Sequence, residues 1–212
     1  MADVDFFWDP VCPWAWITSR WVVEVQGLRD YSVEWRSISL AVLNDQLVAD
    51  WYTPEYRRGH LAGLECLRVA DAVRLAEGNE AVGRLYTALG TGIHNEQQRQ
   101  AVRAGTGAFI AEMLGRAGLD RDFAEHHLDE SHDEHIRADT ALALERTGND
   151  VGTPILTFRP GAPDENSFFG PVIARIPRGD EALRLWDAVE VIATTSGMAE
   201  LKRSLRSRPV FD

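Results

Sequence analysis

The chain has little of several features that would suggest particular functions. It has one lysine against 21 arginines, two cysteines, and no run approaching the roughly 20 apolar residues needed to span a bilayer. Its formal net charge of −11 repels phosphate groups, which makes nucleic acid and anionic membrane surfaces poor candidate partners. No Gly-x-Gly-x-x-Gly pattern follows a strand, so no flavin or nicotinamide site is evident.

The first residues, Met-Ala-Asp-Val-Asp-Phe, lack the basic start, apolar core and cleavage site of a secretory signal. We therefore expect a cytoplasmic location. In a reducing cytoplasm, a structural disulfide between Cys12 and Cys66 is not expected. Cys66 belongs to an amphipathic helical pattern, which predicts a buried and inert thiol.

Cys12 lies where a strand passes into a helix. Residues 3–9 have the pattern of a short buried strand that Pro10 ends, and Pro13 suits the first position of the following helix. At the first turn of a helix, free N–H groups and the positive end of the helix dipole stabilise a thiolate. We therefore expect the pKa of Cys12 to lie well below the value of about 8.5 of a free thiol.

The four residues from Cys12 form the sequence Cys-Pro-Trp-Ala. A cysteine in place of Ala15 would complete a dithiol redox motif. Trp14 lies between the two end positions of the motif, which favours a place on the rim of a substrate site, whereas Trp16 is expected in the core.

The order of predicted elements indicates the fold. A helix to about Gly27 and a strand over residues 31–43 follow the first strand. Helices are then predicted at 54–77, 80–90, 96–117 with a break near Ala-Gly-Thr-Gly, 121–129 and 133–146. A strand hairpin at 155–158 and 167–169, a helix from Gly179 and a short helix in the tail complete the chain.

This order, β-α-β, a helical block, then β-β-α, predicts an α/β protein with a thioredoxin-like fold and a large inserted all-helical domain. Residues 1–50 and 149–212 would form the discontinuous thioredoxin-like domain, and residues 51–148 the inserted helical domain. Thioredoxin-like proteins place a cis-proline opposite the cysteine at the point where Thr153-Pro154 stands. A cis bond there would expose the backbone of Thr153 as a docking edge.

The histidines are harder to assign. His94 follows a helical pattern and could reach a cleft between the insertion and the core. A second group lies in Glu-His-His-Leu-Asp-Glu-Ser-His-Asp-Glu-His, residues 125–135. No cysteine or second block of ligands joins this group, so we expect a solvated helix face and no metal site.

Several segments together resemble a known family: FWDPVCPWAWITSRW, SLAVLN, IHN, DVGTP, FFGPV, IPRG and LWD. They are similar to the actinobacterial branch of the DsbA-like oxidoreductases, and within it to the mycothiol-dependent nitroreductases. The resemblance covers almost the whole chain. It implies a thioredoxin fold with a helical insertion, mycothiol as thiol cosubstrate, small electrophilic or disulfide substrates, and in some members a homodimer.

The resemblance also implies roles for residues. Cys12 would be the nucleophile that forms a mixed disulfide with mycothiol, and Pro154 the cis-proline opposite it. The substrate pocket would include Pro13, Trp14, Asn44, His94 and Thr153.

Ala15 departs from the family pattern, because members carry the resolving cysteine there. Two interpretations stay open: a substitution made to trap a mixed disulfide, or a natural monothiol enzyme. Ala15 also leaves open a monothiol S-transferase or thiol-dependent isomerase, similar to the kappa-class glutathione transferases. A noncatalytic thiol-binding protein is a third interpretation, against which the intact Cys12-Pro13 start counts.

Overall fold

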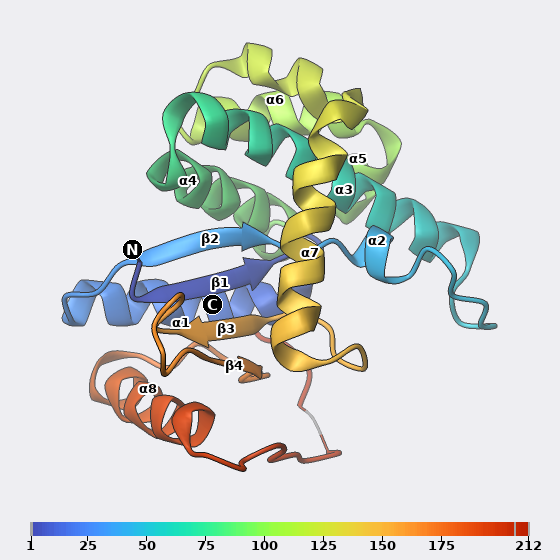
Figure 1. Cartoon of the computed structure of the whole chain (residues 1–212). Coiled ribbons are helices and arrows are strands. Elements are labelled where there is room, and N and C mark those ends of the chain that lie inside the picture. Colours follow the sequence, from blue (N-terminus) through green and yellow to red (C-terminus); the bar gives the residue numbers. More distant parts are fainter. Residues whose placement is uncertain (1, 206, 212) are drawn as a thin grey trace.

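The computed structural model describes residues 2–205 and 207–211 (Figure 1). The strands and the helices around them are β1 (Val4–Trp8), α1 (Pro13–Leu28), β2 (Val33–Ser37), α2 (Leu40–Leu43), β3 (Ile155–Phe158), β4 (Asn166–Phe169) and α8 (Gly179–Thr194). The helices between β2 and β3 are α3 (Pro54–Glu77), α4 (Asn79–Gly90), α5 (Arg99–Ala104), α6 (Thr106–Arg116) and α7 (Asp133–Thr147). The same segment holds a π-helical turn, η1 (Thr91–Asn95), and two 3-10 helices, η2 (Arg121–Leu128) and η3 (Glu130–His132).

The sheet has four strands in the order β2-β1-β3-β4. β1 pairs with β2 in parallel, and α1 makes the crossover between them; β1 with β3 and β3 with β4 are antiparallel. This is the predicted α/β thioredoxin-like topology, and the predicted hairpin at 155–158 and 167–169 is confirmed. The central strand β1 is buried along its whole length, which explains its unbroken apolar sequence.

The alternation along β1 sends side chains to two separate layers. Phe6 and Trp8 belong to the main core with α1, α3, α4 and α8, whereas Phe7 joins a smaller cluster with Ala143 of α7. Figure 1 shows α7 in front of the sheet and α1 behind it. Cys66 is fully buried among apolar side chains and is a free thiol, as expected.

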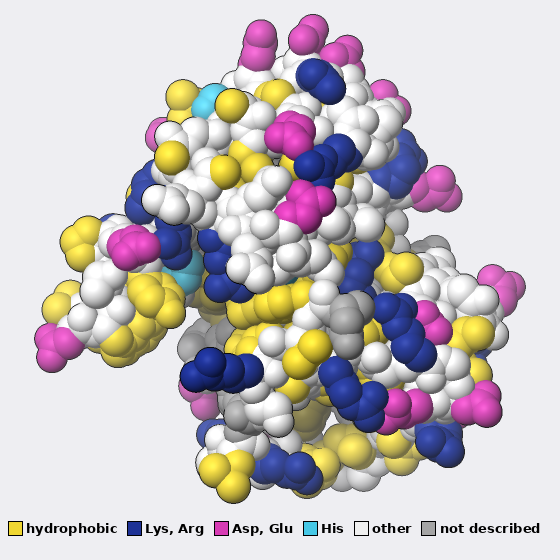
Figure 2. Space-filling view, turned by 180° about the vertical axis from the view of Figure 1, so that it is seen from behind, with side chains coloured by type: hydrophobic (Ala, Val, Ile, Leu, Met, Phe, Trp, Pro, Cys, Tyr) yellow, Lys and Arg dark blue, Asp and Glu magenta, His cyan; other side chains and the backbone are white. Residues whose placement is uncertain are grey.

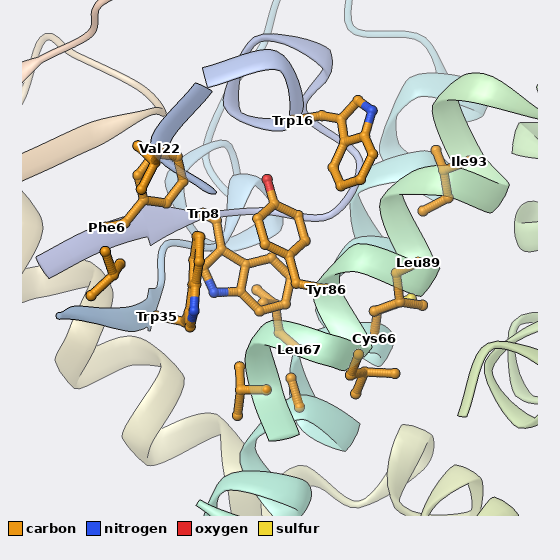
Figure 3. Close-up of a cluster of buried hydrophobic side chains, with 14 of the residues drawn as sticks. Phe6, Trp8, Trp16, Val22, Trp35, Cys66, Leu67, Tyr86, Leu89 and Ile93 are labelled. Atoms are coloured by element: carbon orange, nitrogen blue, oxygen red, sulfur yellow. The ribbon is translucent and has the colours of Figure 1, made fainter. Parts of the chain in front are cut away.

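Tyr86 of α4 joins the helical block to the sheet. Its ring stacks on Trp8 with centroids 4.0 Å apart, and it meets the rings of Trp16 and Trp35 edge-on, each at 5.7 Å. Figure 3 shows Tyr86 between these three indoles. Such pairs stabilise a core by about 0.5–1.5 kcal/mol each beyond area burial. Because the helical block and the sheet share this core, the proposed division at residues 51 and 148 stays a prediction.

Most predicted helices are confirmed, including the break between α5 and α6 at Gly105. The strand predicted over residues 31–43 is too long: β2 ends at Ser37, and Ser39 caps the short helix α2 over residues 40–43. The short helix predicted in the tail is wrong. Residues 201–205 and 207–211 contain no helix, and the last of them are bound elsewhere: the Val210 N–H donates to the Ala174 carbonyl, and Phe211 lies beside His94. Within the described ranges, no helix is both long and apolar enough to cross a bilayer.

Candidate active site

Cys12 is the N-cap residue of α1, the position that a serine or threonine often occupies. β1 ends at Trp8, and a turn closed by the Cys12 N–H to the Asp9 carbonyl at 3.1 Å brings the sulfur to the start of the helix. The Sγ atom accepts the N–H of Ala15 at 3.4 Å. The thiol is therefore held by the first turn of α1, as the strand-to-helix pattern predicts.

The loop before β3 faces this sulfur. The Thr153–Pro154 peptide bond is cis, as expected from the sequence. The Cys12 thiol donates to the Thr153 carbonyl at 3.5 Å, and the Thr153 hydroxyl donates to the Phe7 carbonyl at 2.9 Å. Two segments 141 residues apart thus meet at one sulfur atom.

The expected lowering of the Cys12 pKa is wrong for this conformation. Only 6% of the residue is exposed, and this burial raises the pKa of the thiol to about 12. The N–H groups of Ala15 and Trp14 lower it, but they do not offset the burial and the nearby Asp9 carboxylate. The thiol proton also points to the Thr153 carbonyl, an acceptor that would repel a thiolate.

Asp9 is a functional candidate that the sequence motifs do not indicate. Its carboxylate is fully buried and accepts the Val11 N–H at 2.9 Å and the Leu40 N–H at 2.8 Å. It therefore links the loop before Cys12 to the start of α2. Burial raises the pKa of Asp9 to about 7 despite these two donors. The available signal was an acid three residues before the cysteine, between a strand end and a helix start.

His94 lies beside the same loop, on the π-helical turn η1. Its Nε2 lies 2.8 Å from the Pro10 carbonyl and its Nδ1 lies 3.2 Å from the Arg99 guanidinium. A carbonyl can only accept and a guanidinium can only donate, so Nε2 carries the proton and Nδ1 the lone pair. Burial lowers the pKa of His94 to about 4, which keeps the ring neutral. Both ring nitrogens are engaged with the protein, and neither contacts Cys12.

The other residues that the sequence analysis singled out follow Cys12 in α1 or lie at the end of α2. Pro13 and Trp14 are half-buried and directly follow the cysteine, and the rim position of Trp14 stays a prediction. Trp16 is 2% exposed, as expected of a core residue. Ala15 is fully buried behind the sulfur. Asn44 is the C-cap of α2, and its side-chain amide donates to the Leu40 carbonyl of the same helix at 2.8 Å.

The C-terminal tail closes one side of the site, which the sequence did not indicate. Trp16 donates its indole N–H to Asn95 at 3.0 Å, and Asn95 donates to the Phe211 carbonyl at 2.8 Å. The Phe211 ring lies 5.5 Å from that of His94. The arm between α2 and α3 projects from the molecule and carries exposed hydrophobic side chains (Figure 2), among them Val48 and Trp51.

A cysteine at the start of α1, opposite a cis-proline loop on this sheet, is the arrangement of DsbA-like thiol–disulfide oxidoreductases, and the protein is an enzyme of this class. The family model described as "Rv2466c-like: Mycothiol-dependent nitroreductase Rv2466c" matches residues 11–203. The chain belongs to this family.

The chain is also similar to two individual proteins. The uncharacterised protein Rv2286c of Mycobacterium tuberculosis (strain ATCC 25618 / H37Rv) is 30% identical over 205 residues, which cover 96% of this chain and 82% of that protein. The crystal structure of a proposed protein disulfide isomerase from Nitrosomonas europaea has a TM-score of 0.57 and 15% identity, with 89% of this chain and 96% of that chain covered. At this identity the second likeness supports the fold alone.

Proposed function

We propose that this protein captures mycothiol as a mixed disulfide on Cys12 and exchanges it with external thiols. The observation that supports this most directly is the placement of the Cys12 sulfur between the Ala15 N–H and the Thr153 carbonyl. The Ala15 N–H can stabilise the thiolate, and the backbone at Thr153 can serve as the docking edge for an incoming disulfide. The family match supports mycothiol as the thiol.

In the first step the Cys12 thiolate attacks one sulfur of mycothiol disulfide. The Cys12–mycothiol disulfide forms, the original S–S bond breaks, and one mycothiol leaves as a thiolate that takes up a proton. Ionisation requires the thiol proton to leave the Thr153 carbonyl. We therefore propose that an incoming substrate displaces this contact, and that the helix N–H groups then stabilise the thiolate.

The second step depends on residue 15. A thiolate at this position would attack the Cys12 sulfur and release mycothiol, leaving an intramolecular disulfide. The methyl group of Ala15 has no such capacity, so release needs an external thiol. Both interpretations of Ala15, an engineered substitution and the natural residue of a monothiol enzyme, stay predictions.

Nitroreductase activity stays a proposal that rests on the family name. Reduction of a nitro to a nitroso group consumes two electrons and two protons and releases water. With Ala15, two external thiols would supply both electrons and leave as a disulfide. We assign no further cofactor to this step.

The test compares this chain with its Ala15→Cys and Cys12→Ser variants. Ala15→Cys should gain turnover of mycothiol disulfide in the presence of a reducing thiol, because an intramolecular step then releases mycothiol. Cys12→Ser should neither form the adduct nor turn over. A mycothiol adduct that forms on Cys12→Ser as it does on the parent chain would show that Cys12 is not the nucleophile.

Ala15 itself favours a second candidate, an S-transferase similar to the kappa class, since one sulfur at a helix start suffices to hold a cosubstrate. The discriminating assay is conjugation of a small electrophile to free thiol. If this chain conjugates electrophiles while Ala15→Cys gains no redox turnover, the transferase is the better interpretation.

The remaining partner predictions are also proposals. We propose that the enzyme is cytoplasmic. We propose Pro13, Trp14 and Thr153 as contacts for the bound thiol. His94 would position the loop at Pro10. Asn44 stays a weaker candidate for substrate contact. The homodimer is tested by sedimentation; a single species of monomer mass would remove it.

A further inference from the structure

The histidine-rich segment 125–135 forms a compact cluster far from Cys12 in the sequence. His126 comes from η2, His132 from η3, and Asp129 from the bend between them. The three side chains converge, with one ligand-type atom of each within 4.8 Å of the others. His132 is 8% exposed, so this is not the solvated helix face that the sequence pattern suggested.

Asp71 of α3 orients the ring of His132. Its carboxylate lies 2.8 Å from the Nδ1 of His132 and also contacts the Nδ1 of His135. Because an ionised carboxylate only accepts, the Nδ1 of His132 carries the proton and its Nε2 carries a lone pair. A carboxylate that holds a histidine in this way is the usual support behind a metal-binding imidazole.

The lone pair of His132 accepts the Nδ1–H of His126, and a bound cation would take the place of that proton. Its Nε2 lies 3.2 Å from the Nδ1 of His126 and 3.8 Å from the Oδ2 of Asp129. The remaining separation, from the His126 Nδ1 to the Asp129 Oδ2, is 3.6 Å. The other oxygen of Asp129 accepts the Ser131 N–H at 3.0 Å, which orients the carboxylate and leaves Oδ2 for the cluster.

These separations match the size of a metal ion. A point equidistant from the three atoms lies about 2.1 Å from each, which is the usual length of a bond from zinc to histidine nitrogen or carboxylate oxygen. The side chains of His126 and Asp129 are 42% and 44% exposed, so an ion can enter from solvent and keep a water ligand.

We propose that His126, Asp129 and His132 bind a divalent cation of the zinc class, with Asp71 orienting His132. Two imidazoles and one carboxylate suit zinc better than calcium or magnesium, which prefer all-oxygen sites. The ion would join η2 and η3 to α3. Asp71 lies 61 positions before His132, so the carboxylate that supports this imidazole is not visible in the local sequence pattern.

The experiment strips bound metal with a chelator, dialyses the protein against zinc, and measures the zinc retained per chain. The Cys12→Ser background keeps the redox thiol from contributing. The parent should bind one zinc ion per chain, and zinc should raise its thermal midpoint. His126→Gln and Asp129→Asn should lose stoichiometric binding and the thermal shift. Both replace partly exposed side chains, so their folding without zinc, followed by circular dichroism, should match that of the parent.

Two further variants separate a metal site from a merely structural cluster. Asp71→Asn should weaken zinc binding by about 10- to 100-fold, as loss of a supporting carboxylate does. His127→Gln is the matched control, because its Nδ1 faces the Ala124 carbonyl at 2.8 Å outside the three-residue set, and it should bind as the parent does. Substoichiometric zinc in the parent, or full binding by His126→Gln and Asp129→Asn, would overturn the proposal.

Discussion

The buried Asp9 carboxylate should make the stability of this protein fall as the pH rises through neutrality. Asp9 is fully buried, and two N–H donors do not offset the loss of water around the charge. Burial raises the pKa of Asp9 from 3.8 to about 7. The folded protein therefore keeps a proton that the unfolded chain has released.

The size and sign follow from the two pKa values. Below about pH 4 both states are protonated and Asp9 has no effect. Between pH 4 and 7 only the unfolded chain ionises, so the free energy of unfolding falls by up to 1.36 kcal/mol for each pH unit. The loss is complete above pH 7 and amounts to about 4 kcal/mol in all, of which roughly 3 kcal/mol falls between pH 5 and 8.

The assay is urea unfolding between pH 5 and 8 for the parent and Asp9→Asn. The variant loses one of two hydrogen bonds, which lowers its stability by a constant, so the comparison is between slopes. The slope caused by Asp9 should disappear in Asp9→Asn and persist in Asp50→Asn, which replaces an exposed carboxylate. Parallel curves for parent and Asp9→Asn would refute a buried carboxyl with a raised pKa.

Three further predictions concern the surroundings of the sulfur. Asp9→Asn should speed alkylation of Cys12 at pH 8, because ionised Asp9 raises the pKa of the thiol; an unchanged rate would argue against this coupling. Gly90→Ala should destabilise the protein by about 1–3 kcal/mol or more in urea unfolding, because the added methyl group overlaps the ring of Trp16. His94→Ala should cost about 1–3 kcal/mol by leaving a buried loop carbonyl without its donor, and should slow mixed-disulfide formation, with partial recovery in His94→Gln.

Local sequence patterns predicted most of the helices and strands of the fold. Pro10 and Pro13 mark the end of β1 and the start of α1, and apolar repeats at three- and four-residue steps mark α3, α4 and α7. The placement of Cys12 opposite the cis bond before Pro154 also followed, because topology fixes both positions. The helix predicted in the tail is wrong because the tail is held by contacts with His94 and Ala174, which are distant in the sequence and which no local pattern indicates.

The electrostatics could not be predicted from the sequence. A helix start lowers the pKa of a thiol only if the desolvation of the sulfur is smaller than the stabilisation by N–H groups. That balance depends on the Thr153 loop and on Asp9, which close over Cys12 in three dimensions. The two hydrogen bonds of the His94 ring likewise involve Pro10, 84 residues away, and a guanidinium whose direction no pattern gives.

The most direct test of the account is the intact mass of this chain after incubation with mycothiol disulfide. We expect one mycothiol added per chain, located on Cys12 by peptide mapping, stable until a reducing thiol is supplied, and released without added thiol in Ala15→Cys. Cys66 should stay unmodified because it is fully buried. No adduct on Cys12, or an adduct that this chain releases unaided, would contradict capture by one sulfur without internal release.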